Sequence, residues 1–312
     1  IDSMRFFKIL IPFCFLIHFL SNAQQSSAFR SEYEKIHDLV HTKLKVDFNF
    51  ADKTMNGEAW ITLKSHFYTS NKLVLDAKYM LIHKVALNDE LLNFNYDLSK
   101  ISIDLPKKYS KDERFTIYIQ YTAQPEKVVV SGKTKIAKGK GLYFINSDGL
   151  DTNKPTQIWT HGQPEENSCW FPTLDAPNQK TTQEVYITVP KKYTTLSNGT
   201  LVNQIENGAH RTDYWKLDQK HAPYLFFMGI GEYEIIKDSY LQLPVNYYVE
   251  KKQAPFAKEI FGLTPEIIGF FSRITGVEYP WSSYNQIVGS VETYHLGFVN
   301  NNTFSSDILV AN

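Results

Sequence analysis

Alternation of apolar and polar residues is the feature that most limits what this chain can fold into. Apolar side chains occupy every second position from Leu44 to Phe50, with charged or amide side chains between them. Because successive side chains of a strand point to opposite faces, this pattern predicts a half-buried β-strand. Asn56–Gly57 predicts a turn, and the alternating run from Ala59 to Leu63 predicts a second strand that pairs with the first.

The same pattern continues along much of the chain. Further strands are predicted at residues 73–75, 101–105, 115–121, 185–190, 213–217 and 224–228, and a turn at Asn198–Gly199. Many short strands separated by turns indicate a mainly β fold, an antiparallel saddle or sandwich. The basic run 133–140 is interpreted as a solvated hairpin or loop and not as a binding patch.

The periodicity changes after these strands. Pro244–Val249 still predicts a strand, but apolar residues then recur every three or four positions over residues 256–274. This spacing predicts an amphipathic helix, the first long helix of the chain. Thr264–Pro265 restarts or kinks the helix, and Gly276 ends it. Residues 277–288 lead into another strand.

The segment Thr156–Lys180 interrupts the alternation. It contains three prolines, a polar run and the apolar triplet Cys169–Trp170–Phe171. A long segment without strand periodicity in a strand-rich region is typical of an active-site wall. The alternative is a packed loop whose aromatic side chains fill a core. The thiol of Cys169, next to an indole, is interpreted as a packing group and not as a nucleophile.

The same segment resembles the signature of the M1 (gluzincin) aminopeptidase family. Thr160-His-Gly-Gln163 stands at the place of the family's TQxQ or TQxE element. Pro172-Thr-Leu-Asp-Ala-Pro177 stands at the place of its FPCxDEP-like element, at the family's spacing. Softer similarities occur in the family's order, to its first hairpin, its SNG turn and its last strand pair before the catalytic domain, at residues 41–63, 196–202 and 215–225.

The N-terminal residues, discussed below, and the resemblance together imply a domain organisation. Residues 1–23 are expected to be a signal peptide and residues 32–240 an M1-like N-terminal β domain. Residues 241–312 are expected to be the truncated beginning of an α+β, thermolysin-like catalytic domain.

The resemblance also implies a substrate site. In the family, the Gln or Glu of the TQxQ element and the glutamate of a GxMEN strand hold the free amino terminus of the peptide substrate. A carboxylate suits an ammonium because their hydrogen bond is charge-assisted. Gln163 takes the first role here, and an ungapped count places Gly297, Val299 and Asn300 at the second motif. Val299 stands where the glutamate is expected, and it cannot pair with an ammonium.

Three explanations of Val299 stay open. The alignment of the tail is displaced, and Glu292 supplies the carboxylate. Alternatively, the full-length protein has lost or altered its aminopeptidase specificity, an explanation favoured because Gly297 and Asn300 keep the expected spacing. The third explanation is a sequencing or splicing error in the last stretch of the chain.

The chemistry of the family depends on zinc. Two histidines of an HExxH motif and a later glutamate bind the metal, and the glutamate of the motif activates water. This chain contains no HExxH. His37 and His41 have the spacing, but Asp38 follows the first histidine and the run continues into a strand, so no metal site is expected there. Zinc is therefore expected for the full-length family member, and neither metal nor catalytic residues are expected in this chain.

The N-terminus predicts export. A basic start at Met4–Lys8, an apolar run from Ile9 to Leu20 and the small residues around Ala23 are typical of a secretory signal peptide. We expect cleavage after Ala23, a periplasmic, cell-surface or secreted location, and no stable membrane insertion of the mature chain. An uncleaved anchor is the alternative. Since basic and acidic residues are equal in number, at 33 each, charge gives no argument for a nucleic-acid partner.

Three functions follow as hypotheses. The first is the N-terminal part of an exported M1-like zinc aminopeptidase, which contributes binding of the substrate amino terminus. The second is a non-catalytic M1-like binding or scaffold protein with a degenerate GxMEN motif. The third is an unrelated secreted carbohydrate-binding sandwich, which explains the strands but not the helix after Pro244.

Overall fold

The computed structural model of the chain describes residues 34–127, 140–290, 303–305 and 308–311. The chain divides into a segment 1–34 and a unit 35–312, and all the elements named here belong to the second. Most of the basic run 133–140 lies outside the described residues. The strands of the described part form four sheets, which confirms the prediction of a mainly β fold.

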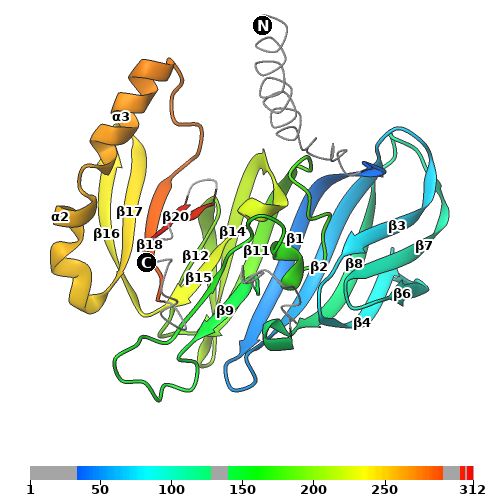
Figure 1. The fold of residues 1–312 in the computed structure, drawn as a ribbon, viewed down its shortest axis with the longest axis horizontal. Helices are drawn as coiled ribbons and strands as arrows, with labels where there is room; N and C mark the ends of the chain where they lie inside the picture. Colours follow the sequence, from blue (N-terminus) through cyan, green and yellow to red (C-terminus); the bar gives the residue numbers. More distant parts are fainter. Residues whose placement is uncertain (1–33, 128–139, 291–302, 306–307, 312) are drawn as a thin grey trace, which may run out of the picture. The chain divides into compact units, whose positions relative to one another are not determined.

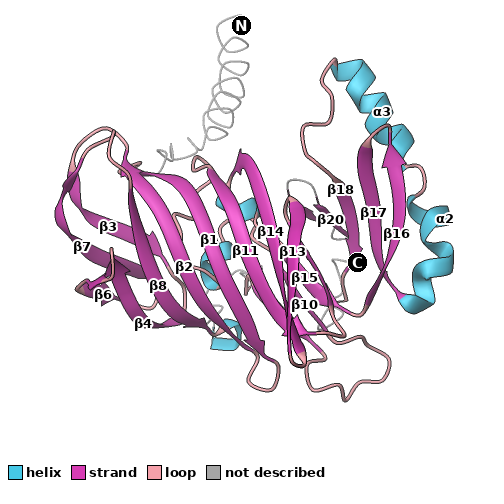
Figure 2. Ribbon diagram, turned by 180° about the vertical axis from the view of Figure 1, so that it is seen from behind, coloured by secondary structure: helices cyan, strands magenta, loops and turns pink. Residues whose placement is uncertain are grey.

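The largest sheet has eight strands in the order β13-β14-β11-β1-β2-β8-β4-β5. Figure 2 shows its strands β14, β11, β1, β2 and β8 side by side. Neighbours are antiparallel except β1 and β11, which are parallel. The strands are β13 (Thr200–Asn207), β14 (His210–His221), β11 (Thr181–Pro190), β1 (His37–Asn49), β2 (Thr54–Ser65), β8 (Phe115–Ala123), β4 (Met80–Leu87) and β5 (Glu90–Leu91).

Two smaller sheets share a core with the eight-stranded sheet. The first has the order β3-β7-β6, and the second has the order β12-β15-β10-β9. One cluster of buried side chains joins all three sheets, with Leu44, Leu73 and Ile158 fully buried in it. The strands in which buried and more exposed residues alternate therefore have one face in this core. The strands are β3 (Ser70–Asp76), β7 (Lys100–Tyr109), β6 (Phe94–Tyr96), β12 (Thr194–Ser197), β15 (Met228–Gly231), β10 (Gln157–Thr160) and β9 (Leu142–Ile145).

The fourth sheet carries the α-helices and has the order β16-β17-β18-β20-β19. Its central strands β17, β18 and β20 are parallel, as expected where helices connect strands. Helices α2 (Ala257–Phe261) and α3 (Thr264–Thr275) lie beside β16 and β17 (Figure 1). The strands are β16 (Tyr233–Tyr240), β17 (Leu243–Glu250), β18 (Tyr284–Val288), β20 (Ile308–Ala311) and β19 (Thr303–Ser305). Among the described residues, the α-helices come only after Pro244, as predicted.

The predicted turn at Asn56–Gly57 is wrong. Both residues belong to β2 and pair with Asp47 and Val46 of β1. The chain reverses earlier, over residues 50–53, where the amides of Ala51 and Asp52 donate to Oδ1 of Asn49 at 3.0 Å. Gly57 is required for packing, because a Cβ there would lie 2.2 Å from the ring of Tyr121 on β8.

Two other segments differ from the prediction. Residues 224–228 are not one strand: a 3-10 helix (Pro223–Leu225) precedes β15. Conversely, the segment 156–180 begins with strand β10, all four residues of which are buried. A strand covered on both faces does not alternate, so periodicity gave no signal for it.

Candidate functional site

Gln163 lies on a loop that leaves the end of β10. It follows Thr160 by three residues and is partly exposed, whereas its neighbour Gly162 is buried. A Cβ at Gly162 would lie 2.4 Å from the side chain of Asn167 and from the carbonyl oxygen of Tyr224. Only glycine therefore fits the tight start of this loop, and the position of Gln163 is set by close packing.

Asn167 holds the loop from within. Its side chain is fully buried. Its Nδ2 donates to the carbonyl oxygens of Pro223 at 2.6 Å and Phe226 at 3.0 Å. Its Oδ1 accepts a hydrogen bond of 2.6 Å from the indole of Trp170, which is also fully buried. One amide thus fixes the loop to residues 223–226 and places the indole in the core.

The loop is also joined to the end of β3. Asp76 and Thr173 exchange two backbone hydrogen bonds, of 2.7 and 3.0 Å. The amide of Lys78 donates to the carbonyl oxygen of Ser168 at 2.7 Å, and the amide of Asp175 donates to Oδ2 of Asp76 at 3.0 Å. The FPCxDEP-like element therefore has a structural role here, since it anchors the loop that carries Gln163.

Two potentially reactive groups of this loop are buried. Burial raises the pKa of the Cys169 thiol to about 12, which keeps it protonated at neutral pH and agrees with its interpretation as a packing residue. Burial likewise raises the pKa of the Asp175 carboxyl to about 6, although its Oδ2 accepts a 2.9 Å hydrogen bond from the amide of Ser168. Neither group is placed to act on a ligand.

A second set of contacts joins β10 to the end of the fourth sheet. The indole of Trp159 donates to the carbonyl oxygen of Ser290 at 2.9 Å, and the amide of Ser290 donates to Oε1 of Gln157 at 2.8 Å. The ring of Tyr143 stacks on Trp159, with 4.7 Å between centroids. The strand that leads to Gln163 is therefore tied to the residue that precedes the segment 291–302.

The other predicted site residues are not placed. Gly297, Val299 and Asn300 lie outside the described residues, as does the alternative Glu292. The spatial relation of Gln163 and Val299 therefore remains a prediction.

The sequence analysis did not single out His161 and Glu166. They lie on the loop of Gln163, and Nδ1 of His161 is 3.6 Å from a carboxylate oxygen of Glu166. The ties of Gln157 and Trp159 to Ser290 were also missed. No signal in the sequence identified the contacts with Ser290, because they join residues 131 and 133 positions apart. His161 and Glu166 lie in a loop without periodicity, which gives no sign that their side chains approach each other.

The residues that the structure describes do not fit a zinc site. In the ranges 34–127 and 140–290, no three His, Cys, Asp or Glu side chains lie close enough to hold a metal ion. His37 is buried in β1, edge-on to the ring of Phe115, and Nδ1 of His41 lies 2.7 Å from the hydroxyl of Thr182. We therefore derive no step of chemistry through a metal in this chain.

Fold and loop together define an M1-type N-terminal domain, with the beginning of a mixed sheet and helices after it. The family model of the peptidase M1 N-terminal domain matches residues 32–225. The chain belongs to this family, and the unrelated carbohydrate-binding sandwich is no longer a candidate.

The chain is similar to two kinds of curated relative. It is 22% identical to transcription initiation factor TFIID subunit 2 of Danio rerio over 311 residues, with 85% of this chain and 25% of the relative covered. The Schizosaccharomyces pombe protein of the same name is 26% identical, with 55% and 17% covered. Human glutamyl aminopeptidase is 25% identical over 133 residues, with 42% and 14% covered. The chain thus spans a quarter or less of these relatives.

Solved structures share the fold. An M1 zinc metallopeptidase variant from Deinococcus radiodurans, bound to the substrate Tyr-Ser-Ala, superposes with a TM-score of 0.73 at 16% identity. The match covers 90% of this chain and 61% of that one. A second structure, of the M1 zinc metallopeptidase from Deinococcus radiodurans, superposes with a TM-score of 0.70 at 15% identity. At such identity, the likeness concerns the fold alone. Among the described residues, no helix has the length and apolar character needed to cross a membrane.

Proposed function

We propose that this chain supplies the part of an exported M1-like zinc aminopeptidase that binds the amino terminus of the peptide substrate. The zinc ligands and the water-activating glutamate belong to polypeptide that this chain does not contain. Gln163 contributes the acceptor for the substrate ammonium through its amide oxygen. The backbone of residues 297–300 runs along one edge of the bound peptide.

The observation that carries the proposal is the double anchoring around Gln163. On one side, Asn167 holds its loop by buried hydrogen bonds, and Asp76 holds it by a partly buried one. On the other side, Trp159 and Gln157 hold Ser290, the residue before the segment expected to contain the second motif. Binding of a small cation requires acceptors in fixed positions, because flexible groups lose entropy when they bind.

The strength of amine binding depends on Val299. An ammonium donates three hydrogen bonds and prefers a carboxylate, whereas an amide oxygen is a neutral acceptor. With valine in place of the glutamate, Gln163 alone is expected to bind a free amino terminus weakly. We therefore propose altered specificity for the parent enzyme.

A non-catalytic scaffold is the second candidate. It is favoured by the relatives described as TFIID subunit 2, one of which matches 85% of this chain, and by Val299. In this case the M1-like domain would contact another protein and would not require an ammonium site. Gln163 would then be replaceable without loss of function.

The open reading frame beyond residue 312 tests the two candidates. We expect an HExxH motif and a downstream glutamate there. The extended protein should bind one zinc ion per chain by metal analysis and release the chromophore of an aminoacyl-anilide, whereas the 312-residue chain should do neither. Gln163→Ala in the extended enzyme should raise KM for free-amine substrates while zinc content is unchanged. An extended frame without zinc ligands would support the scaffold.

Export is tested separately. We propose cleavage after Ala23, so intact-mass analysis of secreted protein should give an N-terminus at Gln24. Retention of the apolar run 9–20 in the mature protein would instead show an uncleaved anchor.

A further inference from the structure

The loop between β2 and β3 exposes two adjacent aromatic side chains. Phe67 is 72% exposed and Tyr68 is 88% exposed. Next to them, just before β1, lies Ile36, which is 47% exposed and whose carbonyl oxygen accepts a 2.8 Å hydrogen bond from the amide of His66. Exposed apolar side chains that stand singly are common, whereas a group of them indicates a surface for contact with another molecule.

Contacts within the domain fix the position of this loop. The imidazole of His66 packs edge-on against the ring of Phe67, with 4.1 Å between the ring centroids. Nδ1 of His66 lies 2.9 Å from Oδ1 of Asp38, and Nζ of Lys35 lies 2.9 Å from the same oxygen. A side chain that is already fixed loses little conformational entropy when it meets a partner, so the ring of Phe67 is suited to a binding surface.

The turn between β7 and β8 lies beside this loop. The hydroxyl of Ser65 donates a 2.7 Å hydrogen bond to the carbonyl oxygen of Tyr109, and Ser70 pairs with Tyr109 in the β3–β7 ladder. Both ends of the loop 66–69 are therefore joined to the last residue of β7, where the turn begins.

The segments 35–38, 64–70 and 107–114 meet here and form the aromatic–basic end of the domain. They contain six lysines and arginines and three aspartates and glutamates, whereas the whole chain has 33 of each kind. Positive charge is therefore concentrated at this end of an otherwise neutral chain, and an acidic surface is attracted to it.

Three of the basic side chains are available to an anionic partner. Lys108, Lys111 and Arg114 are exposed, and none of them makes an ion pair with the residues that the structure describes. Of the acidic residues beside them, Glu113 is paired with Lys107 at 2.7 Å. The field outside this turn is therefore set mainly by its unpaired cations.

The aromatic–basic end lies within the N-terminal domain. All of its residues fall in the range 32–225 that the family model matches. Figure 1 shows β3 and β7 at the opposite end of the large sheet from β16 and β17. The described chain also starts here, at Glu34. As long as the apolar run 9–20 is attached, it joins the domain at this end.

An anionic lipid surface fits this combination of groups. Aromatic side chains are enriched at the level of the lipid headgroups, and basic side chains beside them are attracted to acidic headgroups. Three exposed apolar side chains cover much less than the roughly 800 Å² that each partner contributes to a stable protein–protein interface. A lipid surface is therefore favoured over a protein partner.

We propose that the aromatic–basic end binds the surface of an anionic lipid bilayer, with Phe67 and Tyr68 among the headgroups and the segment 107–114 against acidic lipids. This binding is peripheral and needs no membrane-spanning helix. It goes beyond the proposed function and is independent of it, since it involves neither zinc nor Gln163.

Flotation of the chain from Gln24 with lipid vesicles tests this surface. The leader is left out because its apolar run binds lipid by itself. Vesicles of phosphatidylcholine and phosphatidylglycerol are compared with vesicles of phosphatidylcholine alone. We expect the partition coefficient to be at least about tenfold higher on the acidic vesicles and to fall at high ionic strength. Equal binding to both kinds of vesicle, or binding to neither, would overturn the proposal.

Two substitutions test whether the aromatic–basic end is responsible. Phe67→Ser should lower the partition coefficient on acidic vesicles by about tenfold, and Lys111→Gln by about fivefold. Leu150→Ser, at a side chain that is 82% exposed on another loop, and Lys220→Gln, at an exposed position of β14, are the matched controls. Circular dichroism checks that each fold is retained. Controls that weaken binding as much as the two test variants would show that the bound surface lies elsewhere.

A fluorophore at position 67 reports contact with the bilayer directly. In the chain from Gln24 the only cysteine is Cys169, which is buried, so Phe67→Cys is labelled selectively. Emission from this label should shift to the blue when acidic vesicles are added, whereas emission from a label at Leu150→Cys should not. A chain that binds soluble heparin as tightly as vesicles and shows no blue shift would have a purely ionic surface, which would also overturn the proposal.

Discussion

The indole N–H of Trp159 donates a 2.9 Å hydrogen bond to the carbonyl oxygen of Ser290, which joins β10 to the chain that follows β18. The two residues are 131 positions apart in the sequence. Because β10 leads directly into the loop of Gln163, this bond couples the position of that loop to the fourth sheet.

Trp159→Phe is expected to loosen this connection without removing the aromatic packing. A phenyl ring still stacks on Tyr143, but the carbonyl oxygen of Ser290 loses its donor. We expect a loss of about 1 kcal/mol in the free energy of unfolding. Amide hydrogen exchange in peptides covering 284–290 should become faster, while exchange in β1 and β2 stays the same. Trp60→Phe, on a different sheet, is the control and should leave the 284–290 peptides unaffected.

Asn167→Ala is expected to be among the most destabilising single changes in the loop of Gln163. It leaves the carbonyl oxygen of Phe226 and the indole N–H of Trp170 without this partner, whereas the carbonyl oxygen of Pro223 keeps the amide of Phe226 as a donor. Buried polar groups left unpaired cost about 1–3 kcal/mol each, so a loss of roughly 3 kcal/mol or more is expected in urea denaturation. Asn203→Ala, at an exposed position of β13, should change stability by less than about 0.5 kcal/mol. Equal effects would contradict the anchoring role of Asn167.

The fold could be predicted where local pattern and tertiary packing agree. Strands β1, β2 and β11 each bury one face, so alternation identified them. Periodicity did not predict the structure correctly where packing against distant parts of the chain determines it. Gly57 looked like a turn residue, but it is glycine because Tyr121, 64 positions further along the chain, covers it. Strand β10 is covered on both faces, so it shows no alternation of apolar and polar residues from which a strand could be predicted.

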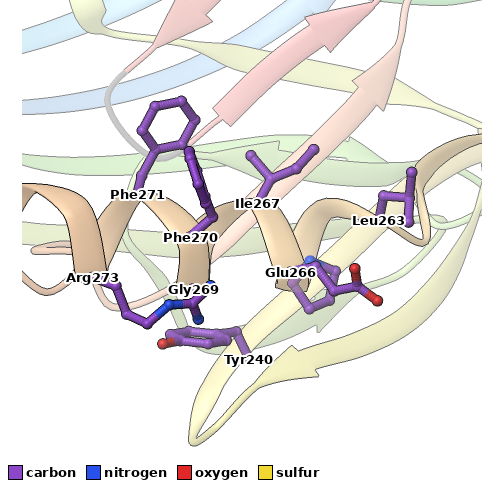
Figure 3. Close-up of a pocket in the computed structure, with 9 residues that line it drawn as sticks. Tyr240, Leu263, Glu266, Ile267, Gly269, Phe270, Phe271 and Arg273 are labelled. Carbon is purple, nitrogen blue, oxygen red and sulfur yellow. The ribbon is translucent and has the colours of Figure 1, made fainter.

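The candidate site was predicted by family resemblance and could not be predicted by physics alone. Nothing local to Gln163 indicates that Asn167 and Gly162 fix its loop, since these contacts involve residues 223–226. The sequence also did not show which face of α3 packs against its sheet. The apolar spacing predicts a stripe on the helix, but the face that meets the sheet carries the small residues Gly269 and Ser272, and Ile267, Phe270 and Phe271 are exposed (Figure 3).

His221 should make stability fall at acid pH. Burial lowers the pKa of its imidazole to about 4. Its Nε2–H donates to Oε1 of Gln183 at 2.9 Å, and its ring stacks on Phe226. The unfolded chain binds the proton near pH 6.5, whereas the folded chain resists it. Stability is therefore complete above about pH 6.5 and falls by roughly 3 kcal/mol towards pH 4. Urea denaturation of His221→Gln should show a smaller loss over this range; an unchanged slope would contradict the assignment.

Asp175 should contribute a dependence of stability on pH that has the opposite sign to that of His221. Burial raises the pKa of its carboxyl to about 6, so the folded chain holds a proton that the unfolded chain releases near pH 4. Its contribution is favourable at low pH and is lost as pH rises through 6. Asp175→Asn keeps an acceptor for the amide of Ser168, and at pH 7.5 it should be more stable than the parent by up to roughly 3 kcal/mol. The difference should vanish near pH 4. The exposed Asp112→Asn should show no such pH dependence, and an Asp175→Asn protein that is less stable at every pH would argue against the buried-charge explanation.

Val299→Glu is the change that tests the proposed ammonium site directly. If the ungapped count is right, the new carboxylate lies near Gln163 and gives a free amino terminus a second, charged acceptor. A charge-assisted hydrogen bond contributes about 1.5–3 kcal/mol, so free-amine inhibitors should bind a full-length enzyme roughly one to two orders of magnitude more tightly. Calorimetric titration with an amino acid amide measures this, and the same ligand with an acetylated amine should show no gain. Phe298→Met changes the neighbouring motif position without adding charge and is the matched control.

If Val299→Glu leaves amine binding untouched while Gln163→Ala weakens it, the alignment of the tail is displaced and the carboxylate must come from elsewhere. Glu292 is then the first residue to exchange. If neither change affects amine binding, the ammonium site itself is refuted, and the scaffold becomes the better account of this M1-like domain.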